Sequence, residues 1–286
     1  MIPAFINPAA GNAEHARSAL LSTGGHFDIR EVAPSHLADR IREAVREGAT
    51  RVLVAGGDGS VGSAAGAIAG TGVELAILPT GTLNHLAKDL KLPLDLAEAA
   101  GVAHQGRIVS VDGATLNGRL FLNTSSVGAY VTFVRARERL EPRLGYRIAS
   151  FVAFIRLLVR LPLFRVTLQV EGVARDYLTP LVFIGVGERE LRLPTLGARV
   201  ENGRPGLHVM VIRRRSGARS LALALAAIAR GLRAVSRTPA MDAFLVESCS
   251  IAPRTRTAAA DGELMTLDPP FEYAHRPDCV KVVVAR

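Results

Sequence analysis

Residues 51–60 read Arg-Val-Leu-Val-Ala-Gly-Gly-Asp-Gly-Ser, and this stretch decides the fold. The apolar run 51–55 predicts a buried strand. The glycines at its end allow a tight turn in which the backbone lies close to whatever faces it. The Ala-rich residues 61–68 predict a helix. The stretch is therefore a strand, a glycine turn and a helix in direct succession.

The same succession recurs through the first hundred residues. Further strands are predicted at 2–6, 27–32 and 75–78, and further helices at 13–21, 37–47 and 83–90. Strands that alternate with helices are typical of a parallel sheet covered by helices on both faces. We therefore predict an α/β domain over residues 1–110.

After residue 106 the pattern changes to strands with few helices between them. Strands are predicted at 108–111, 120–124, 164–170, 177–186, 207–212 and 243–252. Such a series is typical of an antiparallel β-sandwich. We predict this β-rich domain over residues 111–275 and expect the last strand, about 276–286, to return to the first domain. Helices are expected at 132–160, with a break near Pro142, and at 219–235, and the longest loop at 197–205.

Composition limits the class of protein. The chain has 286 residues, 49% of them hydrophobic and 21% charged, which suffices for a sizeable core and excludes a wholly disordered chain. Cys249 and Cys279 are too few for a disulfide framework or a four-cysteine zinc site, which favours a reducing compartment. With no signal-peptide pattern and no apolar run of about 20 residues, we expect a cytoplasmic protein, either soluble or peripheral to the inner face of the membrane.

The net charge of +9 favours an anionic partner. Nucleic acid is disfavoured, because only 5% of the residues are aromatic, Trp is absent and no nucleic-acid-binding motif appears. The histidines lack the spacing of zinc ligands, so a zinc site is not expected.

Two more polar turns follow predicted parallel strands. Asn7-Pro8-Ala9-Ala10-Gly11 follows the first strand, and Pro79-Thr80-Gly81-Thr82-Leu83-Asn84 follows the strand at 75–78. The carboxyl ends of parallel strands meet at one edge of a sheet, where ligands bind. Glycine N–H groups beside a helix N-terminus suit phosphate, and Asp58 adds a carboxylate where phosphates and their magnesium would lie. For residues 56–60 taken alone, the alternative is a tight turn in which Asp58 or Ser60 is the N-cap of the following helix.

Together with Asp261-Gly262-Glu263, these turns follow the order and spacing of the diacylglycerol kinase catalytic family. The chain resembles this family, which includes soluble bacterial lipid kinases and sphingosine kinases and shares the Gly-Gly-Asp-Gly turn with NAD kinases and phosphofructokinases. The resemblance implies a Rossmann-like nucleotide-binding domain followed by a β-rich lipid-binding domain. It also implies ATP and Mg²⁺ as cofactors and a hydroxyl of a diacylglycerol-like lipid as the acceptor of the γ-phosphoryl group.

The resemblance also assigns roles to residues. The positions that match ATP-binding residues of the family are Asn7, Gly11, Gly56, Gly57, Asp58, Gly59, Ser60, Gly81, Thr82 and Asn84. Asp58 is expected to organise magnesium, directly or through water. Glu263 matches the residue that accepts the proton of the lipid hydroxyl, and Asp261 beside it is predicted as a second catalytic residue. Taken alone, Asp261-Gly262-Glu263 is also typical of a hairpin turn.

Two positions depart from the family pattern. His85 stands where an Asp of the metal network usually follows the asparagine, and Glu201-Asn202-Gly203 stands where a structural magnesium loop usually reads Asp-Asp-Gly. These departures leave open a nucleotide- or lipid-binding protein with little catalysis, and the shared Gly-Gly-Asp-Gly turn leaves open an NAD kinase. The acceptor lipid, the nucleotide preference and the oligomeric state stay open, with a homodimer among the alternatives.

Basic segments leave a membrane contact open. In residues 146–161 apolar side chains are interrupted by Arg147, Arg156 and Arg160. Such a segment is typical of a helix on a bilayer surface, or of a helix whose apolar side faces its own core. The triplet Arg213-Arg214-Arg215 is either a solvated loop or a contact with anionic lipid.

Overall fold

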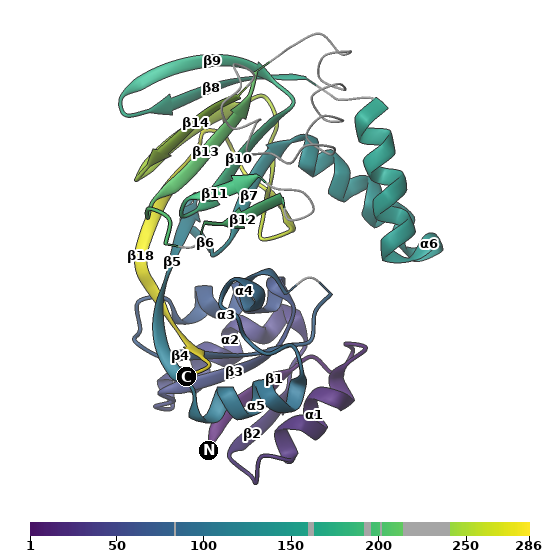
Figure 1. Ribbon diagram of the computed structural model, residues 1–286, viewed down its shortest axis with the longest axis vertical. Helices are drawn as coiled ribbons and strands as arrows, with labels where there is room; N and C mark the ends of the chain where they lie inside the picture. Colours follow the sequence, from purple (N-terminus) through teal and green to yellow (C-terminus); the bar gives the residue numbers. More distant parts are fainter. Residues whose placement is uncertain (83, 160–162, 192–195, 201, 214–240) are drawn as a thin grey trace. The chain divides into compact units, whose positions relative to one another are not determined.

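The computed structural model describes residues 1–82, 84–159, 163–191, 196–200, 202–213 and 241–286. The chain forms two compact units (Figure 1). The N-terminal unit comprises Met1–Gly113, Arg119–Asn123 and Arg276–Arg286, and the C-terminal unit comprises Ala114–Gly118 and Thr124–His275.

A parallel sheet with helices on both faces forms the N-terminal unit, as the sequence predicts. The strands run in the order β2-β1-β3-β4-β18. Their bounds are β1 (Ile2–Ile6), β2 (Phe27–Glu31), β3 (Arg51–Gly56), β4 (Glu74–Pro79) and β18 (Phe271–Val284), of which residues Lys281 and Val282 pair with β4. The helices are α1 (Ala13–Leu21), η1 (Pro34–His36), α2 (Leu37–Arg46), α3 (Asp58–Ile68), α4 (His85–Asp89) and α5 (Leu96–Gln105).

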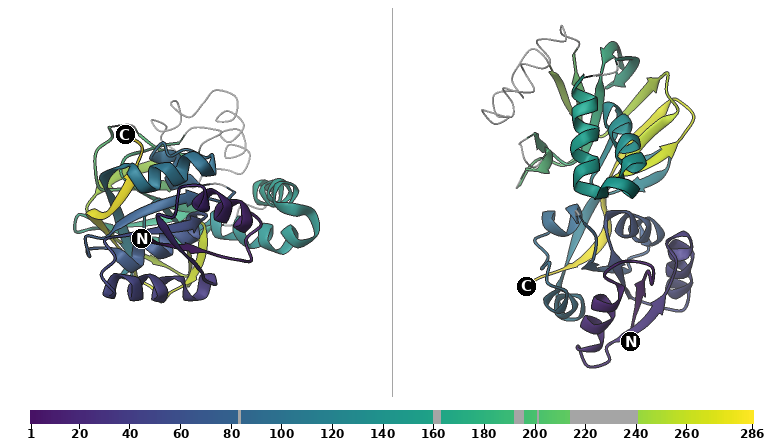
Figure 2. Two further views of the ribbon diagram at one scale, coloured as in Figure 1. Left: turned by 90° about the horizontal axis from the view of Figure 1, so that it is seen from below. Right: turned by 90° about the vertical axis from the view of Figure 1, so that its right-hand side faces the viewer.

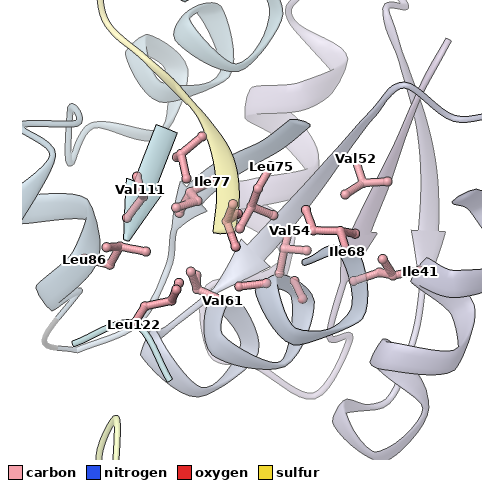
Figure 3. Close-up of a cluster of buried hydrophobic side chains, with 14 of the residues drawn as sticks. Ile41, Val52, Val54, Val61, Ile68, Leu75, Ile77, Leu86, Val111 and Leu122 are labelled. Carbon is pink, nitrogen blue, oxygen red and sulfur yellow. The ribbon is translucent and has the colours of Figure 1, made fainter. Parts of the chain in front are cut away.

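Strand β3 is buried on both faces because its side chains alternate between two apolar clusters. Val52 and Val54 pack with residues of α2, α3 and α4, such as Ile41 and Ile68 (Figure 3). Leu53 and Ala55 belong to the cluster on the other face, which holds residues of α1 and α5. A strand covered in this way needs a continuous apolar run, which is the pattern of residues 51–55.

The sequence pattern missed helix α5. Its buried residues are Ala99, Ala100 and Ala103, so no stripe of large apolar side chains marks it. A capping signal is present at its start. The Asp95 carboxylate accepts hydrogen bonds from the N–H groups of Ala97 and Glu98, both at 3.0 Å.

The C-terminal unit contains antiparallel strands in two groups. One sheet has the order β14-β13-β10-β7-β16-β17, and the other group has the order β18-β15-β8-β9. The bounds are β7 (Thr124–Gly128), β8 (Phe164–Val170), β9 (Val173–Thr179), β10 (Leu181–Val186), β13 (Leu207–Ile212), β14 (Met241–Val246), β15 (Ser248–Pro253), β16 (Thr257–Ala260) and β17 (Glu263–Thr266). Strands β5 (Arg107–Leu116), β6 (Arg119–Phe121), β11 (Arg189–Leu191) and β12 (Leu196–Arg199) complete the set within the described residues.

Side-chain hydroxyl groups join these two groups of strands. The Tyr273 hydroxyl on β18 lies 3.0 Å from the Ser125 hydroxyl on β7, and both side chains are buried. The Tyr177 hydroxyl on β9 lies 2.9 Å from the Asp242 carboxylate on β14 and donates to it. Buried polar groups need hydrogen-bond partners, and here each partner lies in the other group of strands. The two groups of antiparallel strands confirm the predicted β-sandwich class.

Several predicted boundaries were wrong. Residues 177–186 form parts of two strands that meet at Pro180, because proline offers no N–H to a ladder. Residues 243–252 likewise divide at Glu247 between β14 and β15. The predicted loop 197–205 begins inside β12, which pairs with β11. The predicted helix 219–235 lies outside the described residues, as do Arg160, Glu201, Arg214 and Arg215.

Helix α6 (Ala129–Val159) breaks at Gly145 and not at Pro142. Gly145 has a φ of +70° and a ψ of 162°, values that only glycine adopts at low cost. The break separates a first half from a second half that begins at Tyr146. In the part of the chain that the structure describes, no helix has the length and apolarity needed to cross a membrane.

A stacked pair of imidazoles predicts how the stability of the N-terminal unit depends on pH. The ring centroids of His104 and His26 lie 3.7 Å apart. Burial, then His26 and then Arg51 lower the pKa of His104 from its ordinary value. The folded chain therefore favours neutral His104, whereas the unfolded chain takes up a proton below about pH 6.5. We expect the midpoint of thermal unfolding to fall as the pH is lowered from about 7.5 to about 5.5.

The change His104→Gln should reduce this fall, because it removes the group that binds more protons in the unfolded state. Exposed His36 supplies the control, and His36→Gln should keep the decrease seen in the wild type. Equal decreases in wild type and His104→Gln would show that His104 does not contribute.

Candidate functional site

Three polar turns lie side by side at the carboxyl edge of the parallel sheet. They follow β1, β3 and β4, which are neighbours in the sheet. The Asn12 amide donates to the Thr80 carbonyl at 3.3 Å, and the Thr80 N–H donates to the Gly56 carbonyl at 3.2 Å. The structure therefore brings the predicted turn residues of the N-terminal unit to one edge.

The backbones of the second and third turns touch at two glycines. A Cβ atom on Gly81 would lie 2.4 Å from the Cα atom of Gly57, and one on Gly57 would lie 3.1 Å from the Cα atom of Gly81. Gly56 is equally constrained, because a Cβ there would lie 2.4 Å from the Cβ of Ser60. These glycines are required by the close packing of the loops, whatever binds to them.

Asn84 closes the third turn upon itself. Its side chain accepts a hydrogen bond from the Gly81 N–H at 3.0 Å and donates to the Gly81 carbonyl at 2.8 Å and the Pro79 carbonyl at 3.4 Å. Its φ is +50°, in the left-handed region that asparagine tolerates better than most residues. Asn84 thus holds the loop in shape, and its amide is already engaged.

Helix α3 begins at Asp58 behind Gly57, and no side chain caps its N-terminus. The predicted N-cap role of Asp58 or Ser60 is therefore wrong. The first N–H groups of a helix have no partner within the helix, so Asp58, Gly59 and Ser60 present donors at the positive end of α3. This is the geometry in which helix N-termini bind anions.

The carboxylate of Asp58 reaches the start of the next helix. One of its oxygens accepts a hydrogen bond from the Leu86 N–H at 3.3 Å, in the first turn of α4. His85 is the first residue of that helix, so it lies beside the group that Asp58 contacts. The sequence pattern placed Asp58 and His85 in one region, but the hydrogen bond between the two loops could not be inferred from it.

The first turn is held by its own side chains. The side-chain oxygen of Asn7 accepts a hydrogen bond from the Ala9 N–H at 3.0 Å. Asparagine favours local turns closed in this way. Gly11 and Thr82 are exposed, and a Cβ on Gly11 would meet no atom within 4 Å. Asn12 was missed by the sequence reasoning, although it directly follows the recognised turn and joins it to Thr80.

In the C-terminal unit, Asp261 and Gly262 form the turn of the β16–β17 hairpin. Both have positive φ, +46° and +86°, as the tight hairpin turn favoured by Asp-Gly requires. The Asp261 N–H donates to the Thr124 carbonyl at 2.8 Å, and its carboxylate accepts from the Thr124 N–H at 3.1 Å. Asp261 therefore fastens the hairpin to β7. Glu263 is the first residue of β17, and its side chain is exposed.

The described residues fit magnesium at Asp58 only in part. Among them, no group of three or more His, Cys, Asp or Glu side chains is arranged to hold a metal ion. Mg²⁺ is commonly held by one or two carboxylates together with substrate phosphates and water. Asp58 fits that mode, as one carboxylate beside an anion-binding helix end.

The loop Glu201-Asn202-Gly203, where the family pattern has a structural magnesium site, is described only at Asn202 and Gly203. Glu188, near Asn202 in the loop region, accepts a hydrogen bond from the Arg204 N–H at 3.1 Å. The side chains of Arg189 and Arg199 both donate to the Val186 carbonyl, at 2.9 Å and at 3.2 to 3.3 Å. We derive no metal role for Asn202.

The comparisons with known proteins agree with this geometry. Residues 2–116 match the diacylglycerol kinase catalytic domain. The matched residues include all three turns at the sheet edge, and the resemblance predicted from the sequence is confirmed for this part of the chain.

Two relatives come from bacteria and are named as lipid kinases. The protein named "Probable lipid kinase YegS-like" from Cronobacter sakazakii is 35% identical over 134 residues, 44% of this chain and 45% of the relative. Its counterpart from Klebsiella pneumoniae is 34% identical over 150 residues, 49% of this chain and 50% of the relative. The alignments thus span about half the length of the relatives they match.

Solved structures extend the likeness in fold to the whole chain. A diacylglycerol kinase from Bacillus anthracis superposes with a TM-score of 0.76 at 22% identity, covering 99% of this chain and 96% of that one. An NAD kinase from Archaeoglobus fulgidus, solved in complex with ATP, gives a TM-score of 0.52 at 10% identity, covering 99% and 93%. At these identities the superpositions establish a shared fold and no more.

The contact between Gly57 and Gly81 predicts a sharp difference between two glycine-to-alanine changes. Gly81→Ala places a Cβ against backbone and should lower the free energy of unfolding by about 1–3 kcal/mol. Gly66→Ala serves as control, since Gly66 is exposed in α3 and a Cβ there meets nothing within 4 Å. That change should be neutral or stabilising by about 0.5–1 kcal/mol. Urea unfolding of both variants measures the difference, and equal effects would contradict the close contact.

Proposed function

We propose that the chain is an ATP-dependent lipid kinase, which transfers the γ-phosphoryl group to a hydroxyl of a diacylglycerol-like lipid. The observation that carries the proposal is the arrangement of the three turns at the sheet edge. There the N-terminus of α3 has no side-chain cap, and it directly follows Gly57, which touches Gly81 of the neighbouring loop. The match to a diacylglycerol kinase catalytic domain and the relatives named as lipid kinases support the same reading.

The nucleotide phosphates would bind at the α3 N-terminus. The N–H groups of Gly59 and Ser60 offer donors there, and the helix dipole favours negative charge. Gly81 and exposed Thr82 of the neighbouring loop add a backbone and a hydroxyl group. Fixed donors of this kind neutralise phosphate charge without having to rearrange, which is the main demand of phosphoryl transfer.

Asp58 is the residue we propose for magnesium. One oxygen of its carboxylate is held by the Leu86 N–H, which orients the group and leaves the second oxygen for the ion or its water. A bound Mg²⁺ supplies neutralisation of the phosphate charge that develops during transfer.

Glu263 is the residue we propose as general base. As the lipid hydroxyl oxygen bonds to the γ-phosphorus, the bond from that phosphorus to the ADP oxygen breaks, and the hydroxyl proton passes to the carboxylate. Its position next to a turn fastened by Asp261 gives the carboxylate a rigid support. We assign Asp261 to holding this turn.

A radiolabel assay tests the proposal. Wild-type protein, MgATP labelled in the γ-phosphate and diacylglycerol in mixed micelles should give labelled product that extracts into organic solvent. Glu263→Gln should lower the transfer rate by about 10²–10⁴-fold, because it removes the proton acceptor and keeps the shape. Asp58→Asn should lower it by a comparable factor at saturating lipid.

Two further variants serve as controls in the same assay. Asp268→Asn removes an exposed carboxylate that pairs with Arg256, beyond the end of β17, and should leave transfer unchanged. Asp261→Asn keeps the oxygen that accepts from Thr124 and should retain most activity, whereas a direct chemical role would make it as damaging as Glu263→Gln. Wild-type protein that binds ATP but transfers no label to lipid would instead support the alternative of a binding protein, and label on NAD would support an NAD kinase.

A further inference from the structure

The second half of α6 exposes large apolar side chains along one side. The exposed fractions are 57% for Ile148, 65% for Phe151, 39% for Phe154 and 44% for Ile155. Residues 148, 151 and 155 lie three and four positions apart, so they share one face of the helix. We call these four residues the α6 apolar face. Figure 2 shows both halves of α6 on the outside of the C-terminal unit.

The same helix buries small side chains instead. Ala149 is completely buried and Ala153 is 1% exposed. Folding stabilises a unit by burying large apolar groups, so a helix that only packed against its own core would bury Ile and Phe and expose Ala. The sequence left two alternatives for these apolar residues, a bilayer surface or the core of the protein itself. For the α6 apolar face the second alternative is wrong, because these side chains are exposed.

Positive charge accompanies the exposed face. Residues 142–159 contain Arg143, Arg147 and Arg156 and no acidic residue. Arg143 and Arg156 are exposed. Earlier in α6 the arrangement is different, because Arg137 lies within 3.7 Å of the Glu138 carboxylate and 3.6 Å of the Glu141 carboxylate. Residues 142–159 therefore combine apolar surface with positive charge that no acidic residue of this stretch balances.

We propose that the α6 apolar face lies on an anionic lipid surface, with Arg143 and Arg156 at the level of the headgroups. Helices that bind in the plane of a bilayer insert an apolar face into the boundary between headgroups and acyl chains and hold basic residues on the polar side. Each arginine near an anionic surface adds attraction. This inference goes beyond the proposed kinase activity and does not depend on it, since it concerns binding in the absence of nucleotide.

Co-sedimentation of the full chain with lipid vesicles tests the proposal. The wild type should bind vesicles of phosphatidylcholine mixed with phosphatidylglycerol and should bind phosphatidylcholine alone much more weakly. The double change Ile148→Ser/Phe151→Ser should weaken binding to the mixed vesicles by about ten-fold or more. Arg143→Gln/Arg156→Gln should weaken it by a similar factor and reduce its dependence on salt.

Leu21 and Leu94 provide the matched control, because they are 61% and 51% exposed in the N-terminal unit. Leu21→Ser/Leu94→Ser should bind vesicles as the wild type does. All variants change exposed side chains, and an unchanged thermal unfolding midpoint establishes that they fold.

Any of three results would overturn the proposal, the first two of which concern binding and the third the oligomeric state. The first two are equal binding of mixed vesicles by the wild type and Ile148→Ser/Phe151→Ser, and no binding by the wild type. The third is a wild type that sediments as a dimer without lipid and becomes a monomer in this double variant, which would mean that a second copy covers the face. Because lipid phosphorylation is measured separately with micellar substrate, failure here is distinguishable from failure of the proposed kinase activity.

Discussion

The backbone contact between Gly57 and Gly81 is the constraint on which the candidate site depends. It exists because β3 and β4 are adjacent parallel strands, so the turns after them leave the sheet at the same height. With no side chain at either position, the two turns can touch, and Asn84 and Asp58 then fix them from the third turn and from α3. A phosphate-binding edge requires this kind of rigidity, since its donors must be in place before the ligand arrives.

The C-terminal unit depends on a different kind of contact. Its two groups of strands bury hydroxyl groups that satisfy one another, as Ser125 and Tyr273 do. The same hairpin that carries Glu263 is fastened to β7 through two hydrogen bonds between Asp261 and Thr124. Asp261 thus supports the position of its neighbour in this structure, and its predicted part in the chemistry stays a prediction.

The sequence predicted much of the fold, because the signals concerned are local. Alternating apolar strands and helices identified the parallel sheet, and the glycine turns identified the edge at which we propose that nucleotide binds. Helix α5 was not predicted because it buries alanines and no large apolar side chains. The break in α6 was expected near Pro142, and it lies at Gly145, a glycine with positive φ. The exposure of the α6 apolar face could not be predicted from the sequence, because the same spacing of apolar residues suits a buried and an exposed stripe. Which side of a helix is covered depends on tertiary packing, and the structure alone determines it.

The central claim is that the three turns at the sheet edge bind nucleotide phosphate. Amide hydrogen exchange of the wild type, with and without MgATP, tests it most directly. The account predicts slower exchange on nucleotide addition in residues 7–12, 57–60 and 80–84, with the N–H groups of Gly59 and Ser60 among the most protected. Protection confined to other segments, or none at saturating MgATP, would contradict it.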